Sequence, residues 1–228
     1  MNDKLNFKGC IFDLDGVIVD TAKYHFQSWL KLANSLNIKF TEEQNEHLKG
    51  VSRKESLDYI LKLGNIDLAE HVKSSLCELK NNWYIELISH LSRKDLLPGV
   101  IELLTELKNN QINIALGSAS KNAKSILLAT DIIHFFDYIA DGNSTAKSKP
   151  DPEIFLIASS GLNLNPEECI VFEDSIAGLE AAKAGAFKKI GIGLINNLPI
   201  ADFVVSDLSQ ININTLNQFY GKKITTKL

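Results

Sequence analysis

The chain has 228 residues, of which 45% are apolar and 23% are charged, as in soluble globular proteins of one or two domains. Its formal net charge of −4 excludes a general electrostatic attraction for nucleic acid, so an anionic ligand would need a local basic pocket. No apolar stretch approaches the length of a membrane span, and the N-terminal MNDKLNFKG lacks the apolar region of a signal peptide. Three cysteines without disulfide-framework spacing favour a reducing compartment. We therefore expect a cytoplasmic monomer with small-molecule ligands and no nucleic-acid or membrane partner.

The first informative stretch is CIFDLDGVIVD, residues 10–20. Its first three residues predict a buried strand of a parallel sheet, and the carboxylates of Asp13 and Asp15 follow, with Gly16 allowing a sharp turn. Open α/β sheets bind ligands at the carboxyl ends of their strands. Two carboxylates there could hold Mg²⁺, and one could attack phosphorus as a covalent nucleophile. A solvated turn and a calcium loop are the alternatives, but the calcium pattern requires Gly where Ile18 stands.

Residues 21–91 are predicted to form a helical domain. Apolar residues at helical spacing indicate its first helix: Phe26, Leu30, Ala33 and Leu36. Three further helix starts resemble capping boxes: Thr41 with Gln44, Ser52 with Glu55, and Asp67 with Glu70. Gly50 and Gly64 stand where helices are expected to end. Four helices without an intervening strand are too long for a crossover, so we expect a domain inserted into a core of residues 1–20 and 92–228.

The rest of the chain alternates between predicted strands and helices. Strands are expected at residues 112–116, 138–140, 169–172, 189–192 and 203–205. Helices are expected at residues 98–109 with Pro98 in the first turn, at 121–130, after an Asp151-Pro152 cap, and at 175–184. This alternation predicts an α/β fold with a doubly wound parallel sheet. The polar tail, residues 222–228, is expected to fray.

Polar side chains follow three of the predicted strands. They are Asp13 and Asp15 after the first, Ser118 and Ser120 after the second, and Glu173 and Asp174 after the fourth. Parallel strands place these ends on one edge of the sheet, where the groups converge. Mg²⁺ held by Asp13 and Asp174, with Glu173 nearby, would screen the repulsion between a phosphate ester and its nucleophile.

Phosphoryl oxygens need donors and a positive charge at the same edge. The Ser118 hydroxyl and the free N–H groups of a helix starting at Lys121 could supply the donors. Lys149 could supply the charge. The alternatives are that Ser120 is only a helix cap and Lys149 only a solvated side chain.

Four stretches, DLDGVIVD, GSASKN, KSKPDP and FEDSIAG, resemble the four phosphotransfer motifs of the haloacid dehalogenase (HAD) superfamily. Within it, three stretches resemble the beta-phosphoglucomutase family: DTAKYHFQSW (20–29), LKGVSRKESL (48–57) and GSASKN (117–122). The resemblance covers the whole chain and implies a Rossmann-like core with an inserted helical-bundle cap. It also implies a Mg²⁺-dependent isomerase that interconverts β-D-glucose 1-phosphate and glucose 6-phosphate. The reaction would pass through an aspartyl phosphate and β-glucose 1,6-bisphosphate, which is both intermediate and activator.

The resemblance also implies residue roles. Asp13 would be the nucleophile, and Asp15 the general acid and base, with its backbone carbonyl joining Asp13, Glu173 and Asp174 at the metal. Ser118 and Lys149 would bind the transferring phosphoryl group. The other phosphate, the sugar and the hinge would be served by the remaining residues of the motifs: Thr21, His25, Trp29, Lys49, Gly50, Val51, Ser52, Arg53, Lys80, Ala119, Ser120, Lys121 and Asn122.

Some alternatives stay open at this stage. Arg53 could be a surface residue beside the Ser52 cap rather than a phosphate ligand. The Lys149-Pro150 bond could be cis or trans. A sugar-phosphate phosphatase with the same core and a leakier cap is the second candidate function, and a non-catalytic sugar-phosphate-binding protein is the third.

Overall fold

The computed structural model describes residues 5–145 and 147–221, so the tail predicted to fray lies outside the described residues. Within that part, six parallel strands form one sheet in the order β3-β2-β1-β4-β5-β6. The strands are β1 (Gly9–Phe12), β2 (Asn113–Gly117), β3 (Tyr138–Ala140), β4 (Cys169–Glu173), β5 (Lys188–Ile192) and β6 (Phe203–Val205). The predicted doubly wound α/β sheet is therefore confirmed, with boundaries that differ from the prediction by at most one residue at each compared end.

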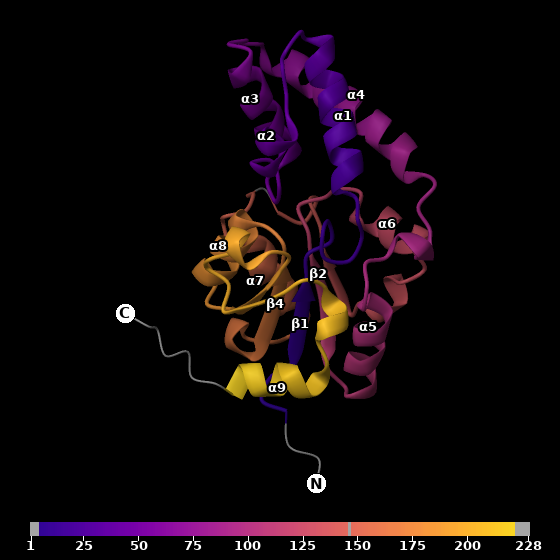
Figure 1. The fold of residues 1–228 in the computed structure, drawn as a ribbon, viewed down its shortest axis with the longest axis vertical. Helices are drawn as coiled ribbons and strands as arrows, with labels where there is room; N and C mark the ends of the chain where they lie inside the picture. The colour runs from indigo at the N-terminus through magenta and orange to yellow at the C-terminus, as the bar shows by residue number, and fades with distance from the viewer. Residues whose placement is uncertain (1–4, 146, 222–228) are drawn as a thin grey trace.

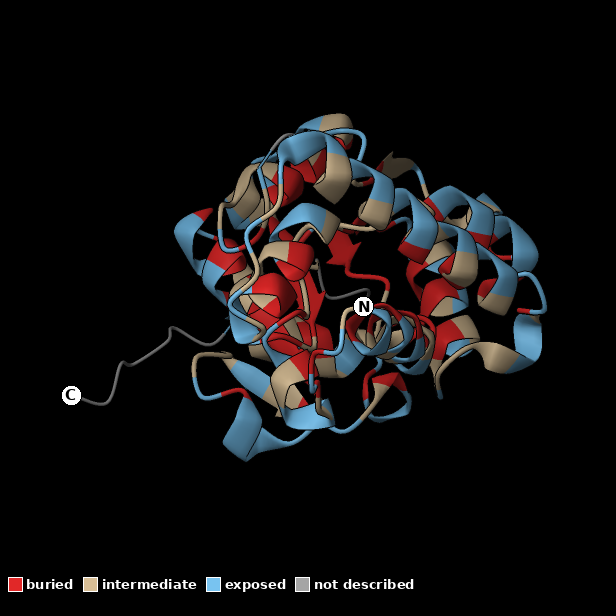
Figure 2. Cartoon of the chain, turned by 90° about the horizontal axis from the view of Figure 1, so that it is seen from above, coloured by how far each residue is buried: buried red, intermediate tan, exposed pale blue. Residues whose placement is uncertain are grey.

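Helices cover both faces of the sheet (Figure 1). They are α5 (Val100–Asn109), α6 (Ala123–Ala129), α7 (Glu153–Gly161), α8 (Ile176–Ala184) and α9 (Ile213–Gly221). Side chains alternate along β1: Cys10 and Phe12 join the apolar cluster that includes residues of α5, α6 and α9, while Ile11 joins the cluster that includes residues of α7 and α8. Both faces of the central strand are thus buried, and in Figure 2 the buried residues lie in the middle of the molecule with the exposed ones on the outer helices.

Four helices between β1 and β2 form the cap, which lies above the sheet in Figure 1. They are α1 (Ala22–Ser35), α2 (Glu42–Glu46), α3 (Arg53–Leu63) and α4 (Glu70–Ile88). The cap has its own apolar cluster, in which Trp29, Leu32 and Leu57 are buried. Trp83 packs against the same cluster. The inserted helical bundle predicted from the sequence is confirmed.

Short 3₁₀ turns occur between the main elements, at Arg93–Asp95, Ile133–Phe135, Pro166–Glu168, Ile195–Asn197 and Leu208–Gln210. Cys10 and Cys169 are buried free thiols. No helix in the described part of the chain combines the length and the hydropathy needed to cross a bilayer.

Two of the three predicted capping boxes form. The Thr41 hydroxyl accepts a bond from the Gln44 N–H at 3.3 Å, and the Gln44 side chain accepts one from the Thr41 N–H at 2.9 Å. Ser52 and Glu55 exchange the equivalent bonds. The box at Asp67 is wrong, because α4 begins only at Glu70, after Ala69, and has no side-chain cap. Gly64 ends α3 as predicted, whereas α2 has already ended at Glu46 and Gly50 lies in the following loop.

Several predicted helix starts are displaced. Pro98 does not lie in the first turn of α5, because Gly99, with φ of +81°, precedes Val100 as the cap. A Cβ at Gly99 would lie 2.1 Å from the Ser209 backbone nitrogen, so only glycine fits there. Helix α6 begins at Ala123 rather than at Lys121. Helix α7 begins at Glu153, so Pro152 and not Asp151 holds the N-cap position, although the Asp151 carboxylate accepts a bond from the Glu153 N–H at 3.0 Å.

Candidate active site

The carboxyl ends of β1 and β4 lie side by side. The two strands pair in parallel with Phe12 opposite Phe172, and the N–H of Asp13 donates to the Phe172 carbonyl at 2.9 Å. Asp13 therefore directly follows β1 and lies next to Glu173, the last residue of β4. The convergence of these carboxylates at one edge, expected from the order of strands and helices, is what the sheet shows.

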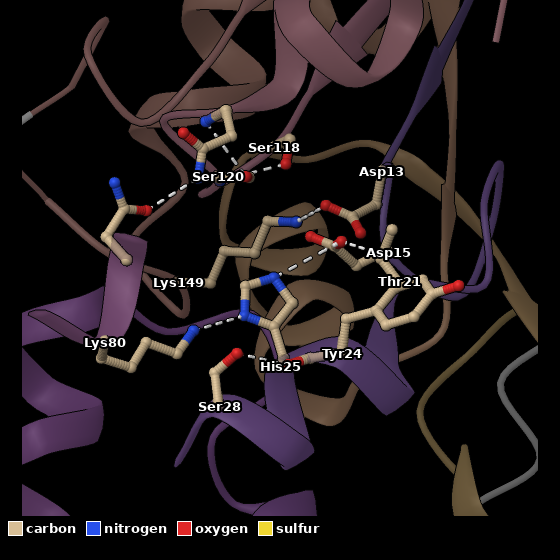
Figure 3. Close-up of polar contacts among 12 residues, drawn as sticks. Asp13, Asp15, Thr21, Tyr24, His25, Ser28, Lys80, Ser118, Ser120 and Lys149 are labelled. Atoms are coloured by element: carbon tan, nitrogen blue, oxygen red, sulfur yellow. Dashed lines mark hydrogen bonds and ion pairs between the residues drawn. The ribbon is translucent and has the colours of Figure 1, made fainter. Parts of the chain in front are cut away.

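Lys149 connects the two strand ends. Its Nζ lies 2.6 Å from Asp13 Oδ1 and 2.6 Å from Glu173 Oε1, and Figure 3 shows the side chain reaching Asp13. Burial alone would lower the pKa of Lys149, but the two carboxylates raise it above its ordinary value, so the ammonium stays charged. Only 2% of the residue is exposed, which rules out the solvated alternative. Of the two isomers left open for the Lys149-Pro150 peptide bond, the structure has the cis form.

Glu173 is held from its other side by the start of α8. Its Oε2 accepts bonds from the Ser175 N–H at 2.7 Å and the Ser175 hydroxyl at 2.9 Å. The Ser175 hydroxyl in turn accepts a bond from the Gly178 N–H at 3.1 Å, as the N-cap of α8. A Cβ at Gly178 would lie 1.8 Å from Glu173 Oε1, so this helix position has room only for glycine.

We expect Gly178→Ala to displace the Glu173 carboxylate and lower Mg²⁺ affinity by roughly 10- to 100-fold, as loss of a supporting group around a metal site does. Calorimetric titration with MgCl₂ measures this. Ala177→Gly, on the same turn of α8, is the control for a change in helix propensity. Equal Mg²⁺ affinity in the Gly178→Ala variant and the wild type would contradict the argument.

The carboxylate cluster fits a divalent cation. Oxygen atoms of Asp13, Glu173 and Asp174 all lie within 4.8 Å of one another. Burial, and after it the neighbouring Glu173 charge, raise the pKa of Asp174 to about 7, so a cation bound to these carboxylates would favour their ionised forms. An all-oxygen donor set is what Mg²⁺ prefers in proteins. The residues present therefore fit a divalent cation such as Mg²⁺.

Asp15 lies beside the cluster on the cap side. The Thr21 hydroxyl donates to Asp15 Oδ1, and His25 Nε2 lies 3.7 Å from the same oxygen. Burial would raise the pKa of Asp15, but the His25 and Thr21 contacts outweigh it and lower the pKa. Asp15 is therefore ionised before substrate binds. His25 Nδ1 lies 3.0 Å from Lys80 Nζ, completing the chain of contacts that Figure 3 shows from Lys80 to Thr21, and burial lowers the pKa of Lys80 to about 7.

A cavity opens between the cap and this edge of the sheet. Fifteen of the predicted site residues line it: Asp13, Asp15, His25, Trp29, Lys49, Gly50, Val51, Ser52, Arg53, Lys80, Ala119, Ser120, Lys121, Asn122 and Asp174. The four others, Thr21, Ser118, Lys149 and Glu173, are buried beside the wall. The cavity wall therefore contains residues of both the cap and the core.

The loop after β2 differs from the prediction. The Ser120 N–H donates to the Ser118 hydroxyl at 3.1 Å, and the Asn122 N–H donates to the Ser120 hydroxyl at 3.2 Å. These two N–H groups are thus engaged within the loop rather than free at a helix start. The Ser120 hydroxyl thus caps the Asn122 N–H just before α6. Ser120 also lines the cavity.

Arg53 is one of three basic cap residues, with Lys49 and Lys80, that line the cavity. It forms no ion pair with any residue in the described ranges, although it lines the cavity. Burial lowers the pKa of Arg53 without any carboxylate nearby to raise it. Arg53 is thus half-buried in the cavity wall, where its guanidinium could bind an anion.

Cap and core touch at several points in this structure. Lys49 Nζ lies 3.7 Å from Asp174 Oδ2, and a Cβ at Gly50, where φ is +75°, would lie 2.9 Å from the Ser175 hydroxyl. On the other side of the cavity, Asn122 Nδ2 donates to Asn81 Oδ1 at 2.9 Å. The cap therefore contacts the core on both sides of the cavity.

Sequence reasoning missed some of the cavity wall. The missed residues are Ala22, Asn45, Leu48, Ser56, Asn81 and Gly142. Ala22, Leu48 and Ser56 lie within the stretches 20–29 and 48–57, whereas Asn45, Asn81 and Gly142 lie outside all of the motifs. None of the six bears a charge, so nothing in the sequence separates them from ordinary residues of the same helices and loops. Only the packing of cap on core shows that they face the cavity.

Comparison with known proteins places the chain in a family. The profile of the haloacid dehalogenase-like hydrolase family matches residues 7–185. Beta-phosphoglucomutase of Bacillus subtilis (strain 168) is 43% identical over 213 residues, 92% of this chain and 94% of the relative. Phosphorylated carbohydrates phosphatase of Thermotoga maritima is 33% identical over 191 residues, 82% of this chain and 85% of the relative.

A solved structure agrees with the sequence relatives. The crystal structure of beta-phosphoglucomutase from Clostridium difficile superposes with a TM-score of 0.91 at 44% identity, covering 94% of this chain and 97% of that one. Such similarity extends over cap and core together. The chain belongs to the haloacid dehalogenase-like family and, within it, to the beta-phosphoglucomutases.

Proposed function

We propose that the protein is a Mg²⁺-dependent phosphomutase that interconverts β-D-glucose 1-phosphate and glucose 6-phosphate. The observation that carries this proposal is a cavity with basic side chains of both the core and the cap beside it. Asp13 and Lys149 lie at the core side, and Arg53, which has no ion-pair partner in the described part of the chain, lines the cavity from the cap. A mutase must bind a sugar bisphosphate in two orientations, with either phosphate at the nucleophile, and therefore needs a second anion site. The Bacillus subtilis and Clostridium difficile relatives support this assignment.

The first half of the reaction phosphorylates the protein. The Asp13 carboxylate attacks the phosphorus at carbon 1 of β-glucose 1,6-bisphosphate, and the bond between that phosphorus and the sugar oxygen breaks. Asp15, carrying the proton that it took from the sugar hydroxyl in the other half-reaction, gives it to the departing oxygen, so the product leaves as glucose 6-phosphate. Lys149 and Ser118 hold the transferring phosphoryl group. The Asp13–Lys149 contact of 2.6 Å keeps the nucleophile in place before substrate arrives.

The second half regenerates the bisphosphate. The hydroxyl at carbon 6 of β-glucose 1-phosphate attacks the phosphorus of phosphorylated Asp13, and the ionised Asp15 takes the hydroxyl proton. The products are unmodified Asp13 and β-glucose 1,6-bisphosphate, which rebinds in the opposite orientation. Asp15 starts this half-reaction in the ionised form that the Thr21 and His25 contacts favour.

In this proposal the metal ligands are the carboxylates of Asp13, Glu173 and Asp174 and the backbone carbonyl of Asp15. Bound there, Mg²⁺ supplies positive charge that screens the transferring phosphoryl group. The three carboxylates already lie close enough to share one cation. β-Glucose 1,6-bisphosphate serves as the activator because it can phosphorylate Asp13.

The remaining predicted residues form the sugar and distal-phosphate contacts. We propose residues 21–91 as the cap, residues 1–20 and 92–228 as the core, and Thr21 as the hinge. Arg53, Ser120 and Asn122 would bind the phosphate that is not transferred, and Ala119 and Lys121 belong to the same loop. His25, Trp29, Lys80 and the Lys49–Gly50–Val51–Ser52 loop would enclose the sugar. We further propose that the protein acts in the cytoplasm as a monomer.

Hydrolysis of phosphorylated Asp13 is the competing reaction, since water can replace the sugar hydroxyl. A closed cap excludes bulk water and so favours the sugar. A ³¹P NMR time course with Mg²⁺, β-glucose 1-phosphate and a trace of the bisphosphate distinguishes the two fates. We expect glucose 6-phosphate with little inorganic phosphate. Inorganic phosphate as the main product would instead support a phosphatase, the activity named for the Thermotoga maritima relative.

The two arginines of the chain provide a matched test of the distal phosphate site. We expect Arg53→Met to raise the concentration of β-glucose 1,6-bisphosphate needed for half-maximal phosphorylation of Asp13 about 100-fold, as loss of a partly buried charge partner does. Phosphorylation by acetyl phosphate, which has no second phosphate, should be unchanged. Arg93→Met is the control, because Arg93 is exposed and pairs with Asp131 at 3.7 Å. Equal effects on both phosphoryl donors would overturn the assignment of Arg53.

A further inference from the structure

Two asparagines meet across the boundary between cap and core. Asn81 belongs to α4 of the cap, and Asn122 precedes α6 of the core. Asn122 Nδ2 donates to Asn81 Oδ1 at 2.9 Å. Both side chains also line the cavity. The contact therefore lies at the site and not on the outside of the cap.

Asn122 is already fixed at its backbone. Its N–H donates to the Ser120 hydroxyl at 3.2 Å, and the Ser120 N–H donates to the Ser118 hydroxyl. The side-chain amide has two possible orientations, which differ in whether oxygen or nitrogen faces the cavity. An anion requires a donor, and a carbonyl oxygen turned toward it would repel it.

The bond to the Asn81 oxygen is compatible with only one of these orientations. That oxygen can accept a bond only from the nitrogen of Asn122, so it turns the Asn122 oxygen away from that contact and leaves one N–H free to donate. Because Asn81 is on the cap, this selection operates only when the cap is closed. With the cap closed, the loop after β2 in the core and helix α4 of the cap would both present donors to the anion.

We propose that Asn81 is a positioning residue, which orients the Asn122 amide for the non-transferred phosphate and links occupancy of that site to cap closure. The inference rests on the proposed function, because it takes the phosphate bound near Arg53 and Ser120 to be that of a sugar phosphate. Asn81 does not act on the reacting atoms. Its contribution is to the affinity for substrates with a distal phosphate and to the exclusion of water during transfer.

The chain offers a matched control in the next residue. Asn82 has the same side chain but is exposed and does not line the cavity. We expect Asn81→Ala to raise KM for β-glucose 1-phosphate about fivefold, the effect of one hydrogen bond on a closure equilibrium. The ratio of inorganic phosphate to glucose 6-phosphate should rise by a similar factor, with kcat changed less than KM. Asn82→Ala should leave all three quantities unchanged.

A double-mutant cycle tests the link to Asn122. If Asn81 acts through Asn122, then Asn81→Ala should have little further effect on KM in an Asn122→Ala background. Asn81→Ser, which is too short to reach Asn122, should reproduce the loss and provides a second variant. Equal effects of Asn81→Ala in both backgrounds, or a KM equal to that of Asn82→Ala, would overturn the proposal.

The same experiments separate this proposal from the assigned activity. A wild-type protein that produces no glucose 6-phosphate would refute the proposed function itself. A wild-type protein that produces it, with Asn81→Ala and Asn82→Ala indistinguishable, would refute only the role of Asn81. Urea unfolding of each variant shows whether any change in KM arises from a destabilised cap.

Discussion

Asp15→Asn is expected to lower the rate of conversion of β-glucose 1-phosphate to glucose 6-phosphate by about 10³-fold or more, within the range found when a general acid–base group is removed. The asparagine keeps the size of the side chain and still accepts a bond from the Thr21 hydroxyl. It cannot take up or release the proton of the sugar oxygen. Calorimetry should therefore show sugar-phosphate binding largely unchanged.

A phosphoryl donor with a good leaving group separates the role of Asp15 from that of Asp13. Acetyl phosphate releases acetate, which needs no proton, so the Asp15→Asn variant should still gain one phosphoryl group by mass spectrometry. Asp13→Asn should gain none, because it lacks the nucleophile. A loss of sugar-phosphate binding in Asp15→Asn, or turnover close to that of the wild type, would count against the assignment.

Lys149→Met is expected to have the largest effect on stability. Methionine has a similar volume, but it leaves the carboxylates of Asp13 and Glu173, each now 2.6 Å from an ammonium, buried without a cation. Removing one partner from a buried charge cluster costs about 3–5 kcal/mol. Urea unfolding at neutral pH, without Mg²⁺, measures this loss in the free energy of unfolding.

Two further measurements distinguish charge from packing at Lys149. Added Mg²⁺ should restore part of the lost stability, because a cation that binds only the folded state stabilises it. Asp13→Asn combined with Lys149→Met should be more stable than Lys149→Met alone, since one of the two charges is gone. Lys8→Met, which removes an exposed pair with Glu168, is the control. If Lys149→Met unfolded at the same urea concentration as Lys8→Met, the electrostatic argument would be wrong.

The sequence predicted elements whose signals are local. Buried strands appear as short apolar runs, and the strand at Phe203–Val205 was predicted at its observed bounds. The boxes at Thr41 and Ser52 form because each side chain bonds within one turn of its own backbone. The similar pattern at Asp67 fails, since α4 starts three residues later and no capping bond forms. A spacing that fits a box therefore indicates a helix nearby without fixing its first residue.

Helix α9 is an element that the local sequence pattern did not predict. Ile213, Leu216 and Tyr220 fall on one helical face, and Leu216 is buried, but polar residues between them obscured the pattern. The displaced start of α6 has a different cause. The serine hydroxyls at positions 118 and 120 accept the N–H groups of the loop, so the chain turns twice before the helix begins.

In the candidate site, too, sequence patterns predicted some contacts and not others. The proximity of the carboxylates after β1 and β4 could be predicted from the sequence, because parallel strands end at one edge of the sheet. That Lys149 contacts both Asp13 and Glu173 depends on a loop whose path no local pattern indicates. Asn81 depends further on how two domains dock. Contacts between distant segments are the part that sequence patterns of a single chain do not contain.

The position of β1 in the sheet has a consequence for how the chain folds. β1 pairs with β2 and β4, so Gly9 meets Asn113 on one side and Cys169 on the other. During synthesis the first strand must remain without sheet partners while the whole helical insertion is made. The insertion has its own apolar cluster, from Trp29 to Leu61, and can collapse early through contacts close in sequence. The proposed nucleophile, Asp13, is thus synthesised before both strands that pair with β1 and is among the last groups to be fixed in place.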